Sequence, residues 1–103
     1  MTTSNTPQVR IRIIRKGNGL VQVLPYPAIL RSGETFLIAN ASGEDAEIEF
    51  NSDLIQPKTC AIPRGKAEPF TAGKGPAYVE FDVELGGRDY AEGGSRPGAI
   101  IDP

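Results

Sequence analysis

Strict alternation of apolar and acidic residues in segment 78–85, YVEFDVEL, is the feature that most limits how this chain can fold. The alternating positions are Val79, Phe81, Val83 and Leu85 on one side and Glu80, Asp82 and Glu84 on the other. Successive side chains of a β-strand point to opposite faces, so the pattern predicts a strand with one buried and one exposed face.

Short segments of the same kind recur along the chain. Strands are expected at 9–14, 20–25, 35–40, 46–50 and 99–102, with further strands near 59–63 and 67–72 and a short helical turn near 51–55. Twelve Gly and nine Pro separate them, and Pro25 and Pro27 require the second strand to break or to lie at a sheet edge. No stretch of three helical turns carries an apolar stripe. Seven or eight short strands predict an all-β, two-sheet Greek-key sandwich.

The length of 103 residues suits one domain. We expect a flexible N-terminal arm over residues 1–7, which are small and polar, and a single β-sandwich over 8–103. An immunoglobulin-like sandwich is the alternative to the arrangement described next.

The order of elements resembles the cupredoxin family. Gly33 precedes the strand 35–40, Asn40 ends it, an alternating strand follows at 46–50, and the strand 78–85 is followed by a loop that closes in PGAII. The resemblance covers residues 20–102 and implies a cupredoxin-like sandwich. It rests on pattern and carries no evidence of activity.

The copper ligands of that family are missing. Cupredoxins bind copper through two His, one Cys and a weak axial ligand such as Met. The resemblance places the first His close to Ala46 and the Cys at Asp82 or Val83, and the chain has no histidine at all. Cys60 lies in the wrong segment. The sequence therefore excludes the family's usual copper site, and we expect no cofactor.

The composition also excludes several other classes. With 11 basic and 13 acidic residues the net charge is −2, which argues against broad nucleic-acid binding. No apolar run approaches the roughly 20 residues needed to span a bilayer. The absence of His removes the usual acid–base and Ser-His-Asp sets, so we expect no enzyme. The N-terminus has no signal-peptide pattern, which favours the cytoplasm, and a role in a virion or other assembly is compatible with the small size.

Acidic residues gather on two predicted strands. In a cupredoxin-like sandwich the strands 46–50 and 78–85 would lie side by side, and their outward acids would form one negative face: Glu47, Glu49, Glu80, Asp82 and Glu84. Like charges directly opposite each other destabilise a sheet. The face is then either an ordinary solvated surface or a dock for a positive partner.

Basic residues gather at the other end of the sequence. Residues 1–31 contain five basic and no acidic residues, whereas 32–57 contain six acidic and no basic residues. The fold would place the first strand, with Arg10 and Arg12, in the sheet opposite the acidic face. This segregation is either ordinary variation or the basis of contacts between copies or with a charged partner.

The glycine-rich loop 86–98, GGRDYAEGGSRPG, is the longest connection expected. It lacks the spacing of a phosphate-binding loop. Arg88, Tyr90 and Arg96 are suited to a binding tip, because Tyr and Arg are favoured at interaction hot spots. The alternative is that the loop folds back over the end of the sandwich with Tyr90 as its plug.

Cys60 lies in TCAIP among apolar neighbours, and we expect it to be buried in the core and unreactive.

Two functional hypotheses remain. The first is a non-catalytic structural or protein-interaction module that binds a protein partner or its own copies. The second is a domain that binds a small ligand or carbohydrate through the 86–98 loop, although the chain has no Trp and only three Tyr for stacking.

Overall fold

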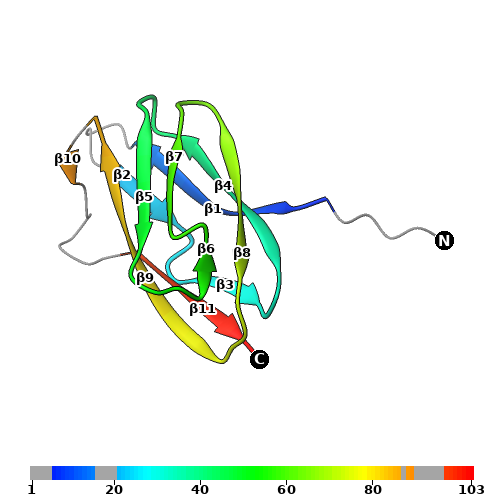
Figure 1. Cartoon of the computed structure of the whole chain (residues 1–103). Helices are drawn as coiled ribbons and strands as arrows, with labels where there is room; N and C mark the ends of the chain where they lie inside the picture. The colour runs from blue at the N-terminus through cyan, green and yellow to red at the C-terminus, as the bar shows by residue number, and fades with distance from the viewer. Residues whose placement is uncertain (1–5, 16–20, 87, 90–96) are drawn as a thin grey trace.

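Two β-sheets pack face to face in the computed structural model of the chain, which describes residues 6–15, 21–86, 88–89 and 97–103 (Figure 1). The strands of the five-stranded sheet are, in spatial order, β2 (Val21–Leu24), β1 (Gln8–Arg15), β4 (Thr35–Ala41), β8 (Ala67–Ala72) and β6 (Ile55–Gln56). Those of the six-stranded sheet are β3 (Ala28–Arg31), β11 (Gly98–Asp102), β9 (Ala77–Leu85), β5 (Ala46–Phe50) and β7 (Thr59–Ile62), with β10 (Arg88–Asp89) paired to β9.

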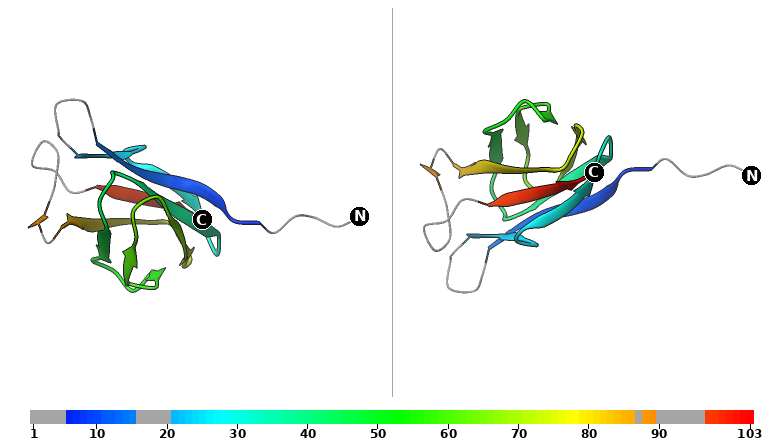
Figure 2. Two further views of the ribbon diagram at one scale, coloured as in Figure 1. Left: turned by 90° about the horizontal axis from the view of Figure 1, so that it is seen from above. Right: turned by 90° about the horizontal axis from the view of Figure 1, so that it is seen from below.

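Seen from above and from below, the two sheets form separate layers, and β1 and β9 belong to different layers (Figure 2). Two strand pairs are parallel, β1 with β4 and β3 with β11, and the other pairs of the described residues are antiparallel. The all-β sandwich is confirmed, and so is the central position expected for the strand 35–40, which is β4.

The proline pair marks the point where the chain changes sheets. The strand ladder stops at Leu24 and resumes at Ala28, so β2 lies at an edge of one sheet and β3 at an edge of the other. Proline lacks the N–H that a ladder requires, which is why the strand breaks here. Both expectations for Pro25 and Pro27, a break and an edge position, are confirmed.

The core lies between the inner faces of the two sheets. It contains all four phenylalanines. The ring of Phe50 lies tilted against that of Phe81, with centroids 4.9 Å apart, and meets that of Phe70 edge-on at 5.6 Å. The alternation in 78–85 has the predicted meaning, because Val79, Phe81 and Val83 are each at most 1% exposed.

The irregular region 51–76 differs in detail from the expectation. Residues 51–54 form bends and a turn and not a helical turn, and the described residues contain no helix. The two short strands after it, β6 and β7, belong to different sheets, so this segment closes the side of the sandwich opposite the proline crossover. No helix able to cross a membrane occurs in the described part of the chain.

Candidate interaction surface

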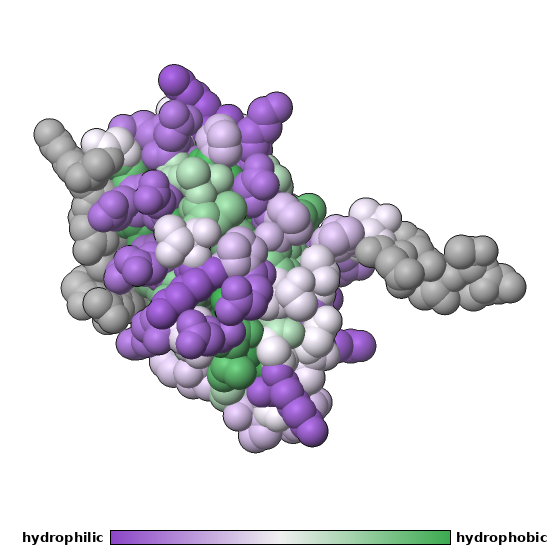
Figure 3. All heavy atoms as spheres, viewed as in Figure 1, coloured by the Kyte–Doolittle hydropathy of each residue, from purple (hydrophilic) through white to green (hydrophobic). Residues whose placement is uncertain are grey.

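The predicted neighbours β5 and β9 are paired, and their outward carboxylates form what we call the acidic strip: Glu47, Glu49, Glu80, Asp82 and Glu84. The antiparallel register places Glu47 directly opposite Glu84 and Glu49 directly opposite Asp82. Glu47, Glu49 and Glu84 are exposed, whereas Glu80 and Asp82 are half-buried. In Figure 3 hydrophilic residues predominate over the region where Figure 1 shows β5 and β9.

A side chain of the neighbouring loop holds one end of the strip in register. The Oδ1 of Asn51 accepts a hydrogen bond of 3.0 Å from the Glu80 amide, and the Asn51 amide donates one of 3.0 Å to the Glu80 carbonyl. These bonds continue the β5–β9 ladder past Phe50. Glu80 is thereby aligned with the other acids of β9.

The other end of the strip opens into a surface hollow of about 220 Å³. Its lining consists of three carboxylate residues and three small residues, namely Asp45, Glu47, Glu84, Ala46, Ala61 and Gly86. Asp45 is already bound by Arg64, whose amide donates to its Oδ1 at 3.0 Å and whose Nε lies 3.9 Å from that oxygen. Glu47 and Glu84 therefore provide the negative charge that suits the hollow to a Lys or Arg side chain. No group of three or more His, Cys, Asp or Glu side chains that could hold a metal ion occurs among the described residues.

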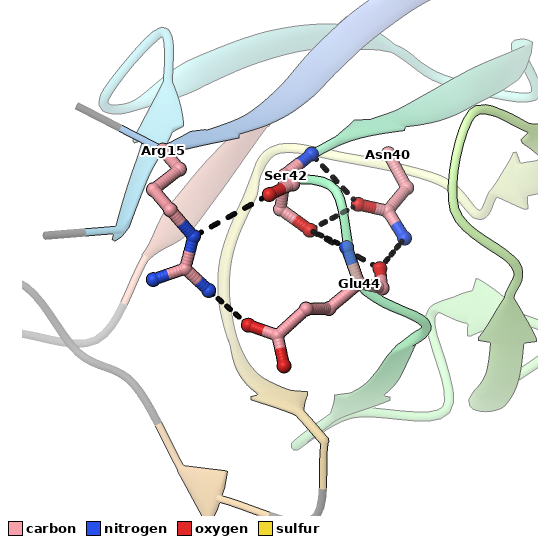
Figure 4. A network of polar contacts seen from close by, with 4 residues as sticks. All are labelled: Arg15, Asn40, Ser42 and Glu44. Carbon is pink, nitrogen blue, oxygen red and sulfur yellow. Dashed lines mark hydrogen bonds and ion pairs between the residues drawn. The ribbon is translucent and has the colours of Figure 1, made fainter. Parts of the chain in front are cut away.

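The loop that carries Asp45 is held by a buried hydrogen-bond network around Asn40 (Figure 4). The Nδ2 of Asn40 donates to the carbonyls of Glu44 at 2.7 Å and Ile62 at 2.8 Å. Its Oδ1 accepts from the Ser42 amide at 3.1 Å and the Ser42 hydroxyl at 2.7 Å. Asn40 and Ser42 are the buried polar residues of the described chain. Asn40 thus joins β4, the loop and β7.

Sequence reasoning identified Asn40 as a marker of the fold but missed this network. Ser42 stands in a loop of Gly and acidic residues, where a serine is expected to face solvent. Only the hydrogen bond from Asn40 to the carbonyl of Ile62, which lies 22 residues further along the chain, reveals that the network connects the loop to β7.

The basic residues of β1 do not form the continuous face that the sequence suggested. The Arg10 Nε lies 2.6 Å from the Glu34 carboxylate, and Arg15 pairs with Glu44 and reaches the Ser42 carbonyl (Figure 4). Arg12 is exposed and pairs in register with Leu24 and Ala39 of the neighbouring strands. β1 does lie in the sheet opposite the acidic strip, as expected. Two of its arginines, Arg10 and Arg15, form ion pairs with acids of the same chain, and Arg12 is exposed on the outer face.

The loop residues are placed only in part. Arg88 belongs to β10, opposite Leu85 of β9, and the last strand begins at Gly98, which was expected to lie in the loop. Tyr90 and Arg96 lie outside the described residues. The hypothesis of a binding tip in this loop therefore stays a prediction.

Cys60 is only half-buried, contrary to the expectation of a fully buried thiol. It points towards the core from β7, but β7 is an edge strand, so one side of the thiol stays accessible. Partial burial raises the pKa of the Cys60 thiol, and the negative charge of Glu68 raises it further.

We expect Cys60 to react with a thiol reagent at neutral pH measurably, but several-fold more slowly in the native protein than in denaturant. A raised pKa leaves less of the reactive thiolate below that pKa, and the native rate should approach the denatured rate as pH rises above it. Glu68→Gln should increase the native rate at neutral pH, whereas Glu80→Gln, at a distant acid, should not. Equal rates in native and denatured protein would show that the thiol is fully exposed.

The comparisons with known proteins agree with this fold. The chain matches no protein-family model and no curated protein. Among solved structures it is similar to the crystal structure of McoA multicopper oxidase, 2F4 variant, from the hyperthermophile Aquifex aeolicus. The TM-score is 0.56 at 19% sequence identity over 97% of this chain, which spans 27% of that one.

A likeness at this identity concerns the fold. At the positions where the resemblance would place the family's first His and its Cys, this chain has the buried Ala46 of β5 and the residues Asp82 and Val83 of β9. This 103-residue chain has a cupredoxin-like β-sandwich fold, without the His and Cys ligands of a cupredoxin copper site.

Proposed function

We propose that this chain is a non-catalytic protein-interaction module and that the acidic strip is its docking surface for a positively charged protein partner. The observation that supports the proposal is the register of β5 and β9, which sets Glu47 against Glu84 and Glu49 against Asp82. Directly opposed like charges destabilise a sheet, by up to about 1 kcal/mol per pair relative to neutral residues. A face with carboxylates opposed in this way, as Glu47 and Glu84 are, gains favourable contacts when a cationic surface covers it.

The hollow at the end of the strip supports the same function. Glu47 and Glu84 line this hollow together with small residues, and a Lys or Arg side chain of the partner would fill it. Charge complementarity of this kind increases the association rate and selects the partner, more than it increases the affinity. Binding should therefore weaken strongly as salt is added, because the Debye screening length falls to about 3 Å at an ionic strength of 1 M.

A second copy of the chain is the other candidate partner. Arg12 is exposed on the outer face of the opposite sheet, so two copies can meet with unlike charges. Sedimentation at increasing protein concentration, at low and high salt, distinguishes the two cases. Arg12→Glu should weaken any self-association through these faces, and a wild type that is monomeric at all concentrations excludes it.

Neutralising one acid of an opposed pair tests the docking role. We expect Glu47→Gln to increase the free energy of unfolding by about 0.5 kcal/mol at low salt, because it removes the repulsion from Glu84, which lies directly opposite. The same variant should weaken binding of tetralysine, followed by residue-resolved NMR titration of β5 and β9. Improved stability with impaired binding is the signature of residues retained for function.

Glu34→Gln is the matched control. Glu34 is paired with Arg10, and its Oε1 accepts a hydrogen bond of 2.9 Å from the Arg31 amide. The same chemical change there should lower stability and leave tetralysine binding unaltered. If Glu47→Gln is not stabilising and tetralysine shifts no residue of the strip in the wild type, the proposal is wrong.

A further inference from the structure

A second kind of surface adjoins the acidic strip on the same sheet. Ile29 of β3, Ile100 of β11 and Tyr78 of β9 are register partners and form one row across three strands. Tyr26, in the proline crossover, lies close enough to Tyr78 that its hydroxyl raises the pKa of Tyr78. We call these four residues the tyrosine patch.

Three of the four residues of the patch are exposed, and Ile100 is half-buried. Tyr26 is 56% exposed, and Ile29 and Tyr78 are each 52% exposed. The other large exposed hydrophobic residues of the described chain, Leu24 and Leu54, are 36% and 37% exposed. The most exposed apolar side chains are thus gathered at one place, and such gathering marks an interaction site more often than scattered exposure does.

Local features restrict the two tyrosines before any partner binds. Tyr26 stands between Pro25 and Pro27, which restrict its backbone. The end of the Tyr78 ring lies against Gly98, so a Cβ atom at that position would require the Tyr78 side chain to move. Rigid aromatic side chains provide contact area at a small cost in conformational entropy.

The patch is continuous with the acidic strip along β9. Tyr78, Glu80, Asp82 and Glu84 share one face of the strand, and residues two positions apart are separated by about 6.6 Å. One surface, about 20 Å long by the same spacing, therefore runs from an apolar end to an acidic end. A same-face contact between two copies in parallel alignment would oppose the carboxylates of both, which disfavours it as the use of this surface.

We infer that the tyrosine patch is the apolar anchor site of the interface and that its ligand is an extended basic segment of another protein. That segment would place one or two aliphatic side chains on the patch. Lys or Arg side chains at every second position would then face the strip, since an extended chain has the same two-residue period as β9. The inference rests on the proposed function, because the strip must bind the basic part.

Three synthetic heptapeptides test the inference, each prepared in both chain directions. The first is Leu-Ile-Lys-Ser-Lys-Ser-Lys, the second has Ser-Ser in place of Leu-Ile, and the third has Glu in place of each Lys. Binding to the full chain is measured by residue-resolved NMR titration. The first peptide should bind about tenfold more tightly than the second, because burial of one or two aliphatic side chains contributes on that order.

Two protein variants test whether the tighter binding of the first peptide arises at the tyrosine patch. Ile29→Ser should remove the tenfold advantage of the first peptide over the second and leave binding of the second unchanged. Leu24→Ser is the control, since Leu24 is an exposed aliphatic residue in β2, at the edge of the other sheet, and it should preserve the advantage.

The outcomes separate the two proposals. Equal binding of the first two peptides overturns the anchor site but leaves the acidic strip as a docking surface. Equal binding of the first and third peptides would show that the ligand need not be basic, which contradicts the inference. If none of the three peptides shifts residues of the strip or the patch, both proposals are wrong.

Discussion

Phe81→Ala is expected to lower the free energy of unfolding by about 3–5 kcal/mol, since removal of a buried aromatic ring loses its burial and leaves a cavity. Phe81 is 1% exposed, lies opposite Phe50 in the β5–β9 pair, and its ring contacts that of Phe50. The ring stands at the centre of the inner face of the six-stranded sheet. For a domain with a total stability of about 5–15 kcal/mol, this is a large fraction.

Chemical denaturation measures the loss, and Tyr78→Ala is the matched control. Tyr78 is an aromatic residue of the same strand, but it points outward and is 52% exposed. Its removal should cost no more than about 1 kcal/mol, because exposed side chains lose little burial. If Tyr78→Ala were the more damaging change, the two faces of β9 would be assigned the wrong way round.

Asn40→Leu is expected to cost about 3 kcal/mol or more, although leucine is close to asparagine in size. The substitution leaves the Ile62 carbonyl without the side-chain amide that binds it and the Ser42 amide without its acceptor. The Glu44 carbonyl and the Ser42 hydroxyl each lose one bond and keep the bond of 3.2 Å between them. Each buried group left without a hydrogen-bond partner lowers the free energy of unfolding by about 1–3 kcal/mol. Rearrangement of the loop would restore some of these hydrogen bonds, so the total loss is smaller than the sum of the separate losses.

Two comparisons test the origin of that loss. Asn51→Leu makes the same change at an exposed asparagine with one side-chain bond, to the Glu80 amide, and should cost about 1 kcal/mol or less. Ser42→Ala removes one donor of the network and should give an intermediate loss. Hydrogen exchange should show that Asn40→Leu opens the loop 41–45 selectively. An effect no larger than that of Asn51→Leu would mean that the network does not support the fold.

Much of the fold follows from local patterns in the sequence. The alternation in 78–85, the proline break after Leu24 and the central strand before Asn40 were each predicted and are each confirmed. Side-chain alternation along a strand depends only on neighbouring residues, so a single chain segment contains the information. The pairing of β5 with β9 was also expected, but through the resemblance to a known fold and not from the segments themselves.

The limits of sequence reasoning appear where residues meet across strands. The pairing of Arg10 with Glu34 divides the basic segment that the sequence suggested, and the edge position of β7 exposes part of Cys60. Neither follows from local composition. Ser42 likewise seemed an ordinary loop residue until its partners were known.

The sequence by itself determined which face of the alternating strand 78–85 is buried, that the chain breaks at Pro25 and Pro27, and that no cupredoxin copper site can form. These features depend on residue identity and on local geometry. Strand order and register decided the rest. Ile29, Tyr78 and Ile100 lie far apart in the chain, and only the parallel pairing of β3 with β11 and the antiparallel pairing of β11 with β9 bring them into one row. A shift of one residue in either register would turn the side chains to the other face, so the tyrosine patch exists only in the folded sheet.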